Sequence, residues 1–141
     1  MGNKASIRKI GFEDIKYLNK KGDKFIIINT LSENEQSCLI KGTISPNDEV
    51  SIINSAMSNP VLQIIIYGKN FSDESIFEKY QKLSNLGFNN VYVYPGGIFE
   101  WLLLQDIYGD VEFPTTTKEL DILKFKPKPI LNKLLLSNNF D

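Results

Sequence analysis

The feature that most constrains the fold is a series of three short apolar runs that alternate with segments of helical periodicity. The runs are Phe25–Ile28, Leu62–Tyr67 and Asn90–Tyr94. The first two are nearly continuous and rich in isoleucine, which is typical of strands buried on both faces of a parallel sheet, and we expect Phe25–Ile28 at its centre. Helical segments follow at 47–57, 72–86 and 98–107. This alternation predicts an α/β fold with a central, mainly parallel sheet and helices on both faces.

Shorter segments surround these runs. Ile7–Ile10 is predicted to be a short strand, and 12–19 has apolar residues at helical spacing. Cys38–Ile40 is predicted to be another short strand. The helix at 47–57 has Asn47 or Asp48 as its candidate N-cap. These segments extend the sheet and its helical layers without implying a second core.

The chain changes character after residue 108. We expect residues 1–108 to form the α/β domain and residues 109–141 to form a C-terminal extension. Three prolines interrupt this extension, and Ile130–Leu136 is its one short amphipathic segment, predicted to be a helix.

The loop after Leu62–Tyr67 carries recognisable helix signals. Ser72 is a suitable N-cap, and Asp73 and Glu74 would then lie in the first turn, where the helix dipole favours acids. Gly87 supplies a left-handed C-terminal stop. We therefore expect a helix from this loop to Leu86.

Composition excludes several kinds of chemistry. The 141 residues include no histidine, one arginine, Arg8, and one cysteine, Cys38. Catalytic triads that depend on histidine, and cysteine-based metal sites, are therefore excluded, and we expect no metal. A net charge of −1 gives no field that would attract nucleic acid.

Cofactor and membrane binding also lack support. Gly96-Gly97 does not have the spacing of a dinucleotide-binding motif, so we expect no cofactor and interpret it as a strand-to-helix turn. No apolar run approaches the roughly 18 residues of a membrane span. We expect no membrane partner and a cytoplasmic location.

Three motifs resemble the rhodanese-like domain family. FIIINT at 25–30 followed by LIKGTI at 39–44 resembles the first central strand and the His-Ile-Pro-Gly-Ala-like motif, although Leu39 and Lys41 replace its histidine and proline. IIIYG at 64–68 is similar to the strand that delivers the nucleophile. LGFNNVYVYPGGIFEW at 86–101 is similar to the family's Gly-Phe, strand, Gly-Gly, helix and tryptophan ending. LLLQDIYG and FPTT, farther along, resemble a branch found in large DNA viruses and unicellular eukaryotes.

The resemblance implies an active-site loop that has lost its reactive groups. Gly68 matches the position of the family's catalytic cysteine. The family's arginine would fall at Asp73. In the related cell-cycle phosphatase type the loop is one residue longer, and its arginine would fall at Glu74. The degenerate loop therefore runs through Gly68, Lys69, Asn70, Phe71, Ser72 and Asp73.

Individual residues of this loop have simpler interpretations. We expect Lys69 to be solvated and Ser72 to cap a helix, because no histidine is present to activate its hydroxyl. Phe71 fits a protein contact and inward packing equally well. Cys38 is a possible reactive thiol, although a partly buried, inert thiol is favoured.

Three functions follow from these expectations. The first is a catalytically inactive rhodanese-like module that binds or regulates a protein partner. The second is a sulfurtransferase that uses Cys38 as a relocated cysteine, or a phosphatase-like remnant. The third is a structural or assembly protein that docks through Ile130–Leu136.

Overall fold

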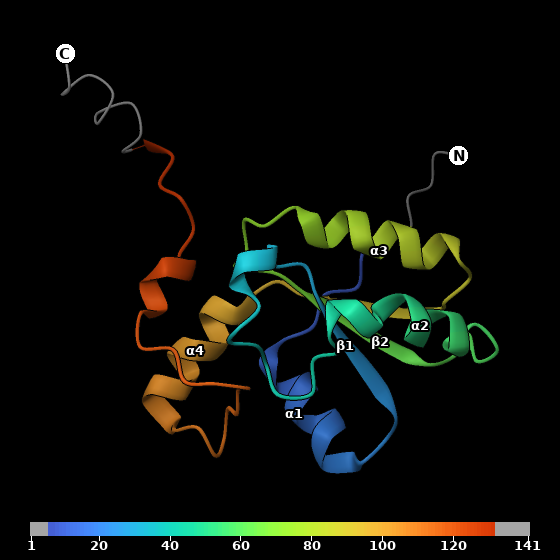
Figure 1. Ribbon diagram of the computed structural model, residues 1–141, viewed down its shortest axis with the longest axis horizontal. Coiled ribbons are helices and arrows are strands. Elements are labelled where there is room, and N and C mark those ends of the chain that lie inside the picture. Colours follow the sequence, from blue (N-terminus) through green and yellow to red (C-terminus); the bar gives the residue numbers. More distant parts are fainter. Residues whose placement is uncertain (1–5, 132–141) are drawn as a thin grey trace.

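The computed structural model describes residues 6–131, and in this part of the chain the predicted alternation of strands and helices is confirmed (Figure 1). The elements in order are α1 (Phe12–Lys21), β1 (Phe25–Asn29), η1 (Glu33–Glu35), α2 (Pro46–Ala56), β2 (Gln63–Tyr67), α3 (Ser75–Asn85), β3 (Asn90–Tyr94), α4 (Gly97–Tyr108) and η2 (Ile122–Phe125), where η marks a 3-10 helix.

The three strands form a parallel sheet in the order β1-β2-β3. Ile65 of β2 is in register with Ile27 of β1 and with Tyr92 of β3. The central strand is therefore β2. The prediction that Phe25–Ile28 lies at the centre is wrong, because the crossover connections place that run at one side of the three-stranded sheet.

The two flanking strands of the prediction shorten to isolated bridges. Ile7–Ile10 contributes one parallel bridge, between Lys9 and Val93, beside β3. Cys38–Ile40 contributes one antiparallel bridge, between Ile40 and Thr115. Thr43 forms a parallel bridge to Ile27 at the outer side of β1.

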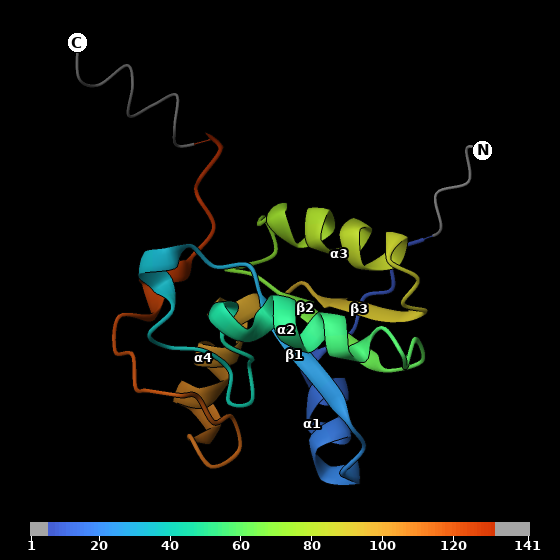
Figure 2. The ribbon, with the colours of Figure 1, turned by 45° about the vertical axis from the view of Figure 1, so that its right-hand side comes forward.

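Two hydrophobic layers cover the sheet because successive side chains of a strand point to opposite faces. Ile64 and Ile66 pack in one cluster with Ile53 of α2 and Tyr80 of α3. Ile65 packs on the other face, in a cluster that also contains residues of α1, α4 and the chain after α4: Ile15, Ile98, Trp101, Phe113 and Phe125. Figure 2 shows α3 above the strands and α1 below them, one helix from each of these two layers.

Residues that follow α4 belong to this second cluster. Trp101 is buried, and its ring packs edge-to-face on Phe113 with the centroids 5.1 Å apart. The indole N–H of Trp101 donates to the carbonyl of Pro114 at 3.1 Å. Phe125 of η2 is also buried. The predicted helix at 130–136 lies, beyond Leu131, outside the described residues.

The start of α2 differs from the prediction. Ser45 caps α2, with its hydroxyl accepting from the amide of Asn47, and Pro46 occupies the first helical position. Asn47 and Asp48 are therefore inside the helix. At the other end of the next helix, Gly87 has φ of +102°, as expected for a left-handed stop.

No helix between residues 6 and 131 has the length and apolar character needed to span a membrane. The same residues contain no cluster of three or more acidic, histidine or cysteine side chains that could hold a metal ion.

Candidate functional site

The candidate site is the loop that follows β2 at the carboxyl edge of the sheet. Gly68 comes directly after Tyr67, the last residue of β2. The first amides of α4 hold this loop, because Ile98 N donates to Gly68 O and Phe99 N donates to Lys69 O, each at 3.0 Å. The first turn of α4 thus fixes the backbone at the start of the loop.

Gly97 allows α4 to approach the loop so closely. Its φ is +64°, and a Cβ atom there would lie only 2.6 Å from Gly68 O. Both the left-handed backbone and the lack of space require glycine. The interpretation of Gly96-Gly97 as a close strand-to-helix turn therefore agrees with the structure.

The carboxylate of Asp73 folds back over the start of the loop. Its Oδ2 accepts from the amide of Lys69 at 2.9 Å. Its Oδ1 accepts from the amide of Ser75 at 3.0 Å and from the Ser75 hydroxyl at 2.5 Å. The Ser75 hydroxyl also lies 2.7 Å from Oγ1 of Thr30, which follows β1. The Asp73 carboxylate is thus an internal anion that occupies the amide of Lys69, a hydrogen-bond donor of the loop.

Asp73 also fills the space beside Gly68. A Cβ atom on Gly68 would lie 2.8 Å from Cγ of Asp73, with Oδ2 closer still, and 2.9 Å from Oγ1 of Thr30. The backbone of Gly68 is not in the left-handed region. Space, and not backbone conformation, therefore explains a glycine here: a side chain at 68 and the Asp73 carboxylate compete for one position.

The prediction that Ser72 caps α3 is wrong. The helix begins three residues later, at Ser75, and Ser72 is exposed with its amide donating to Oδ1 of Asn70 at 2.8 Å. Asp73 and Glu74 precede the helix instead of lying in its first turn. The Asp73 carboxylate is the side chain that accepts from the amide of Ser75.

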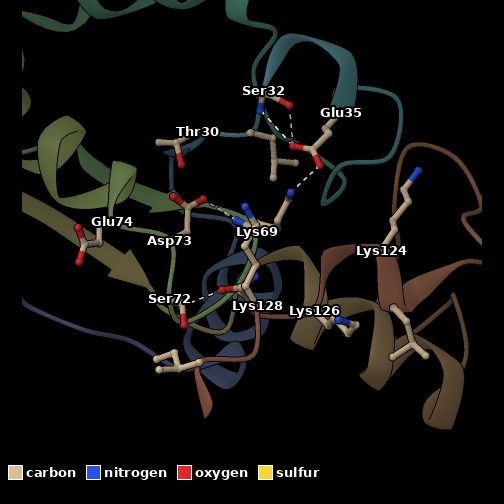
Figure 3. A pocket seen from close by; sticks show the side chains of 14 residues that line it. Thr30, Ser32, Glu35, Lys69, Ser72, Asp73, Glu74, Lys124, Lys126 and Lys128 are labelled. Atoms are coloured by element: carbon tan, nitrogen blue, oxygen red, sulfur yellow. Dashed lines mark hydrogen bonds and ion pairs between the residues drawn. The ribbon is translucent and has the colours of Figure 1, made fainter. Parts of the chain in front are cut away.

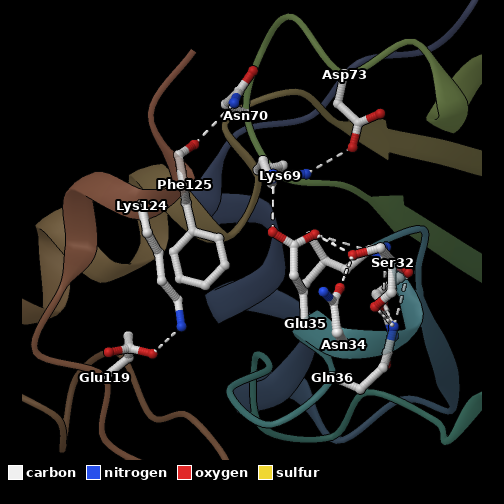
Figure 4. Close-up of polar contacts among 12 residues, drawn as sticks. Ser32, Asn34, Glu35, Gln36, Lys69, Asn70, Asp73, Glu119, Lys124 and Phe125 are labelled. Carbon is white, nitrogen blue, oxygen red and sulfur yellow. Dashed lines mark hydrogen bonds and ion pairs between the residues drawn. The ribbon is translucent and has the colours of Figure 1, made fainter. Parts of the chain in front are cut away.

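Asn70 connects the loop to the C-terminal extension. Its side chain is buried and its Nδ2 donates to the carbonyl of Phe125 at 2.9 Å (Figure 4). The Asn70 side chain therefore makes two connections: its oxygen accepts from the amide of Ser72 within the loop, and its nitrogen donates to Phe125 of η2. Sequence reasoning named Asn70 as a loop residue but gave no sign of its partner.

Lys69 forms an ion pair, contrary to the prediction of a solvated side chain. Its Nζ lies 2.9 Å from Oε2 of Glu35 in η1 (Figure 4). Burial raises the pKa of Glu35, but hydrogen bonds from Lys69 and Ser32 outweigh this effect and leave the pKa below its ordinary value of 4.5. The one cation of the loop is therefore committed to an internal carboxylate.

Phe71 and Cys38 lie in different surroundings. Phe71 is 69% exposed, which favours the protein-contact interpretation over inward packing. Cys38 is 2% exposed, and its thiol donates to the carbonyl of Thr117 at 3.3 Å. The structure thus brings Gly68, Lys69 and Asp73 together and keeps Cys38 in the hydrophobic core.

A groove of about 890 Å³ opens over the loop. Its floor includes Lys69, Asn70 and Asp73. The turn at 30–35 forms one wall, and the extension from Leu123 to Ile130 forms the other (Figure 3). Sequence reasoning missed this second wall, although alternating lysines at 124, 126 and 128 were its available signal.

Comparison with known proteins supports the fold assignment through structure alone. No protein-family model and no curated protein matches this sequence. A yeast protein tyrosine phosphatase of the rhodanese family aligns with a TM-score of 0.62 and 14% identity, over 85% of this chain and 99% of that chain. The rhodanese-like domain of the Alr3790 protein from Anabaena sp. aligns with a TM-score of 0.52 and 20% identity, over 89% of this chain and 88% of that chain.

A thiosulfate sulfurtransferase from Pseudomonas aeruginosa is a third structural neighbour. It aligns with a TM-score of 0.54 and 24% identity, over 69% of this chain and 19% of that chain. The neighbours thus include a phosphatase and a sulfurtransferase on one architecture. Together with the parallel sheet, its two helical layers and the loop after β2, they show that this chain has the rhodanese-like fold.

Proposed function

We propose that this chain is a catalytically inactive rhodanese-like module that binds a protein partner. The observation that carries the proposal is the position of the Asp73 carboxylate. It accepts from the amide of Lys69 and fills the space beside Gly68, where the resemblance to rhodaneses places a nucleophile. The loop therefore holds its own anion in place of a reactive sulfur.

Electrostatics oppose a second anion at this position. A thiosulfate or phosphate group that approached the loop would meet the Asp73 carboxylate at short range. Two like charges about 4 Å apart repel by roughly 1 to 4 kcal/mol near a protein surface. Lys69 would offset this repulsion only by leaving Glu35. Neither a nucleophile nor an uncommitted cation of the loop supports group transfer.

The alternative of a sulfurtransferase with a relocated cysteine would require Cys38 to react. The nucleophile in sulfur transfer is an accessible thiolate, usually beside a positive charge. Cys38 is buried and donates to a backbone carbonyl, which favours a structural role. We therefore keep the inactive module as the proposal.

The placement within the family remains part of the proposal. The loss of the catalytic cysteine, and the likeness of LLLQDIYG and FPTT to proteins of large DNA viruses and unicellular eukaryotes, rest on the sequence motifs alone. A cytoplasmic location is likewise proposed.

Activity assays on the full chain test the absence of catalysis. The substrates are thiosulfate with cyanide, mercaptopyruvate with a thiol acceptor, and p-nitrophenyl phosphate. We expect the wild-type protein to show no turnover above the Cys38→Ser variant with any of them. Sulfur transfer that disappears in Cys38→Ser would overturn the proposal and support the relocated cysteine. Phosphate release that is absent from an Asp73→Ala variant would overturn it in favour of an aspartate-dependent phosphatase.

A further inference from the structure

The C-terminal wall of the groove presents a regular pattern of side chains. Lys124, Lys126, Lys128 and Ile130 all line the groove, whereas Phe125 points into the hydrophobic core. Leu123 and Lys124 lie in η2 and also line the groove, whereas from Lys126 onward the lining positions alternate with a period of two, as expected of extended chain, and Lys126 has extended backbone angles. One side of this segment thus anchors it, and the other side presents cations to the groove.

We propose that this groove binds an acidic peptide segment of a partner protein through Lys126 and Lys128. The inference rests on the proposed function, since it names the surface and the class of partner for a protein-binding module. The ligand segment would place carboxylates against the two lysines and apolar side chains beside them.

The charges around the groove leave these two lysines available. Lys124 pairs with Glu119 at 2.5 Å, and Lys69 pairs with Glu35. Lys126 and Lys128 are exposed and form no ion pair with any residue from 6 to 131. A ligand carboxylate therefore finds two cations that need not break an existing pair.

The acidic residues on the opposite side favour one orientation of the ligand. Asp73 is engaged by backbone amides of its own loop, and Glu74 is exposed beside it. Both carboxylates line the groove and repel acidic groups. The acidic side chains of a bound peptide should therefore lie over Lys126 and Lys128 and away from α3.

Exposed apolar side chains at the same place fit a peptide ligand. Ile130 is 82% exposed and Leu123 is 61% exposed, and both line the groove. Phe71 is exposed in the adjoining loop. An interface that combines such apolar contacts with a charged rim is typical of protein recognition.

The backbone of the wall excludes recognition by strand addition along its length. Pro127 and Pro129 have no amide hydrogen, so this segment cannot donate a regular series of ladder hydrogen bonds. Two uncommitted lysines on a chain of net charge −1 also give too little positive field for a nucleic-acid backbone. Recognition through side chains is the mode that remains.

Fluorescence anisotropy with a defined probe tests the inference on the full chain. The probe is a fluorescein-labelled octapeptide, Gly-Glu-Leu-Glu-Glu-Leu-Glu-Gly, at low ionic strength, and the comparison probe carries lysine in place of each glutamate. We expect saturable binding of the acidic probe that weakens with salt, and no binding of the basic probe. An acidic probe that the wild-type chain does not bind would overturn the inference.

Charge reversal locates the binding surface. Because an exposed ion pair changes affinity by up to about fivefold, Lys126→Glu/Lys128→Glu should weaken binding by about tenfold or more. The control Lys20→Glu/Lys24→Glu makes the same charge change at the opposite edge of the sheet, with Lys20 in the last turn of α1 and Lys24 directly before β1, and should change binding by less than about twofold. Equal losses in both variants would overturn the groove as the site.

Two further measurements separate other occupants. Binding to phosphatidylserine vesicles without binding to the acidic peptide would overturn the inference in favour of a lipid surface. Dimerisation in light scattering that is lost in Lys126→Glu/Lys128→Glu, again without peptide binding, would overturn it in favour of a second copy of this chain. Catalytic turnover would refute the proposed inactive function and would leave the peptide-binding result unchanged. No turnover together with no peptide binding would refute only the proposal that the groove binds an acidic peptide.

Discussion

A Gly68→Ala substitution measures whether Asp73 really excludes a side chain at position 68. In open space this change should stabilise the protein by about 0.4 to 1 kcal/mol, since alanine restricts the unfolded chain and the Gly68 backbone is not left-handed. In this loop the new methyl group would lie 2.8 Å from Cγ of Asp73. The carboxylate must therefore move away.

The magnitude follows from the contacts that the carboxylate would lose. Asp73 accepts from the amides of Lys69 and Ser75 and from the Ser75 hydroxyl, and each such bond contributes about 1 kcal/mol net. We expect Gly68→Ala to lower the free energy of unfolding by about 1 to 3 kcal/mol. Asp73→Ala alone loses the same three hydrogen bonds and should also cost about 1 to 3 kcal/mol.

The double variant contains the decisive information. Without the carboxylate, the two shortest contacts of the methyl group are gone and the next is Oγ1 at the end of the Thr30 side chain, so Gly68→Ala should add little to the cost of Asp73→Ala. The coupling free energy between the two positions should therefore be about 1 to 3 kcal/mol.

Urea unfolding followed by tryptophan fluorescence provides the assay, because Trp101 is the single tryptophan and is buried. A second cycle that combines Gly11→Ala with Asp73→Ala is the control, and it should be additive because no atom lies nearer than 3.9 Å to a Cβ at Gly11. Additive costs for Gly68→Ala and Asp73→Ala would refute the competition for space at the loop.

Three other predictions follow from the core and the ion pair. Trp101→Ala should lower the free energy of unfolding by about 3 to 5 kcal/mol through cavity formation, and urea unfolding followed by circular dichroism checks it; a nearly unchanged midpoint would contradict the burial. Tyr67→Phe should cost about 1 to 3 kcal/mol, because the tyrosine hydroxyl accepts from the buried amide of Ile40 at 3.1 Å; the same assay would contradict this if the variant matched wild type. The pKa of Glu35 is lowered by Lys69 and Ser32 against the effect of burial, so its contribution to stability is present above its ordinary value of 4.5 and is lost as the pH falls through the lowered value. Thermal melts of wild type and Glu35→Gln between about pH 6 and pH 3 should therefore converge as the pH falls, and parallel curves would refute the assignment.

The regular elements were predictable where local sequence decides them. The runs at 62–67 and 90–94 are strands, because continuous β-branched and aromatic residues have few other stable arrangements. The position of Phe25–Ile28 in the sheet was not predictable, because crossover connections decide strand order and local periodicity does not encode them.

The loop was predictable in its charge and not in its packing. The sequence placed a carboxylate at 73 where the related family has arginine, but Ser72 and Asp73 are both suitable caps. Asp73 accepts from Ser75, and the hydroxyl of Ser75 also contacts Thr30, which is distant in sequence. Lys69 likewise finds Glu35 through the fold of the chain after β1. Such pairings depend on tertiary structure, which propensity alone cannot supply.

The bridge between Lys9 and Val93 has a consequence for synthesis. Residues 8–10 close the side of β3, with Val93 N donating to Arg8 O at 2.9 Å and Ile10 N donating to Val93 O at 2.8 Å. A ribosome that adds about 5 to 20 residues per second needs on the order of 4 to 17 s to produce Val93 after Lys9. During this interval β1 and β2 can pair while residues 8–10 have no strand to join. Once β3 emerges, the same residues cover its free edge and protect it from pairing with strands of other chains.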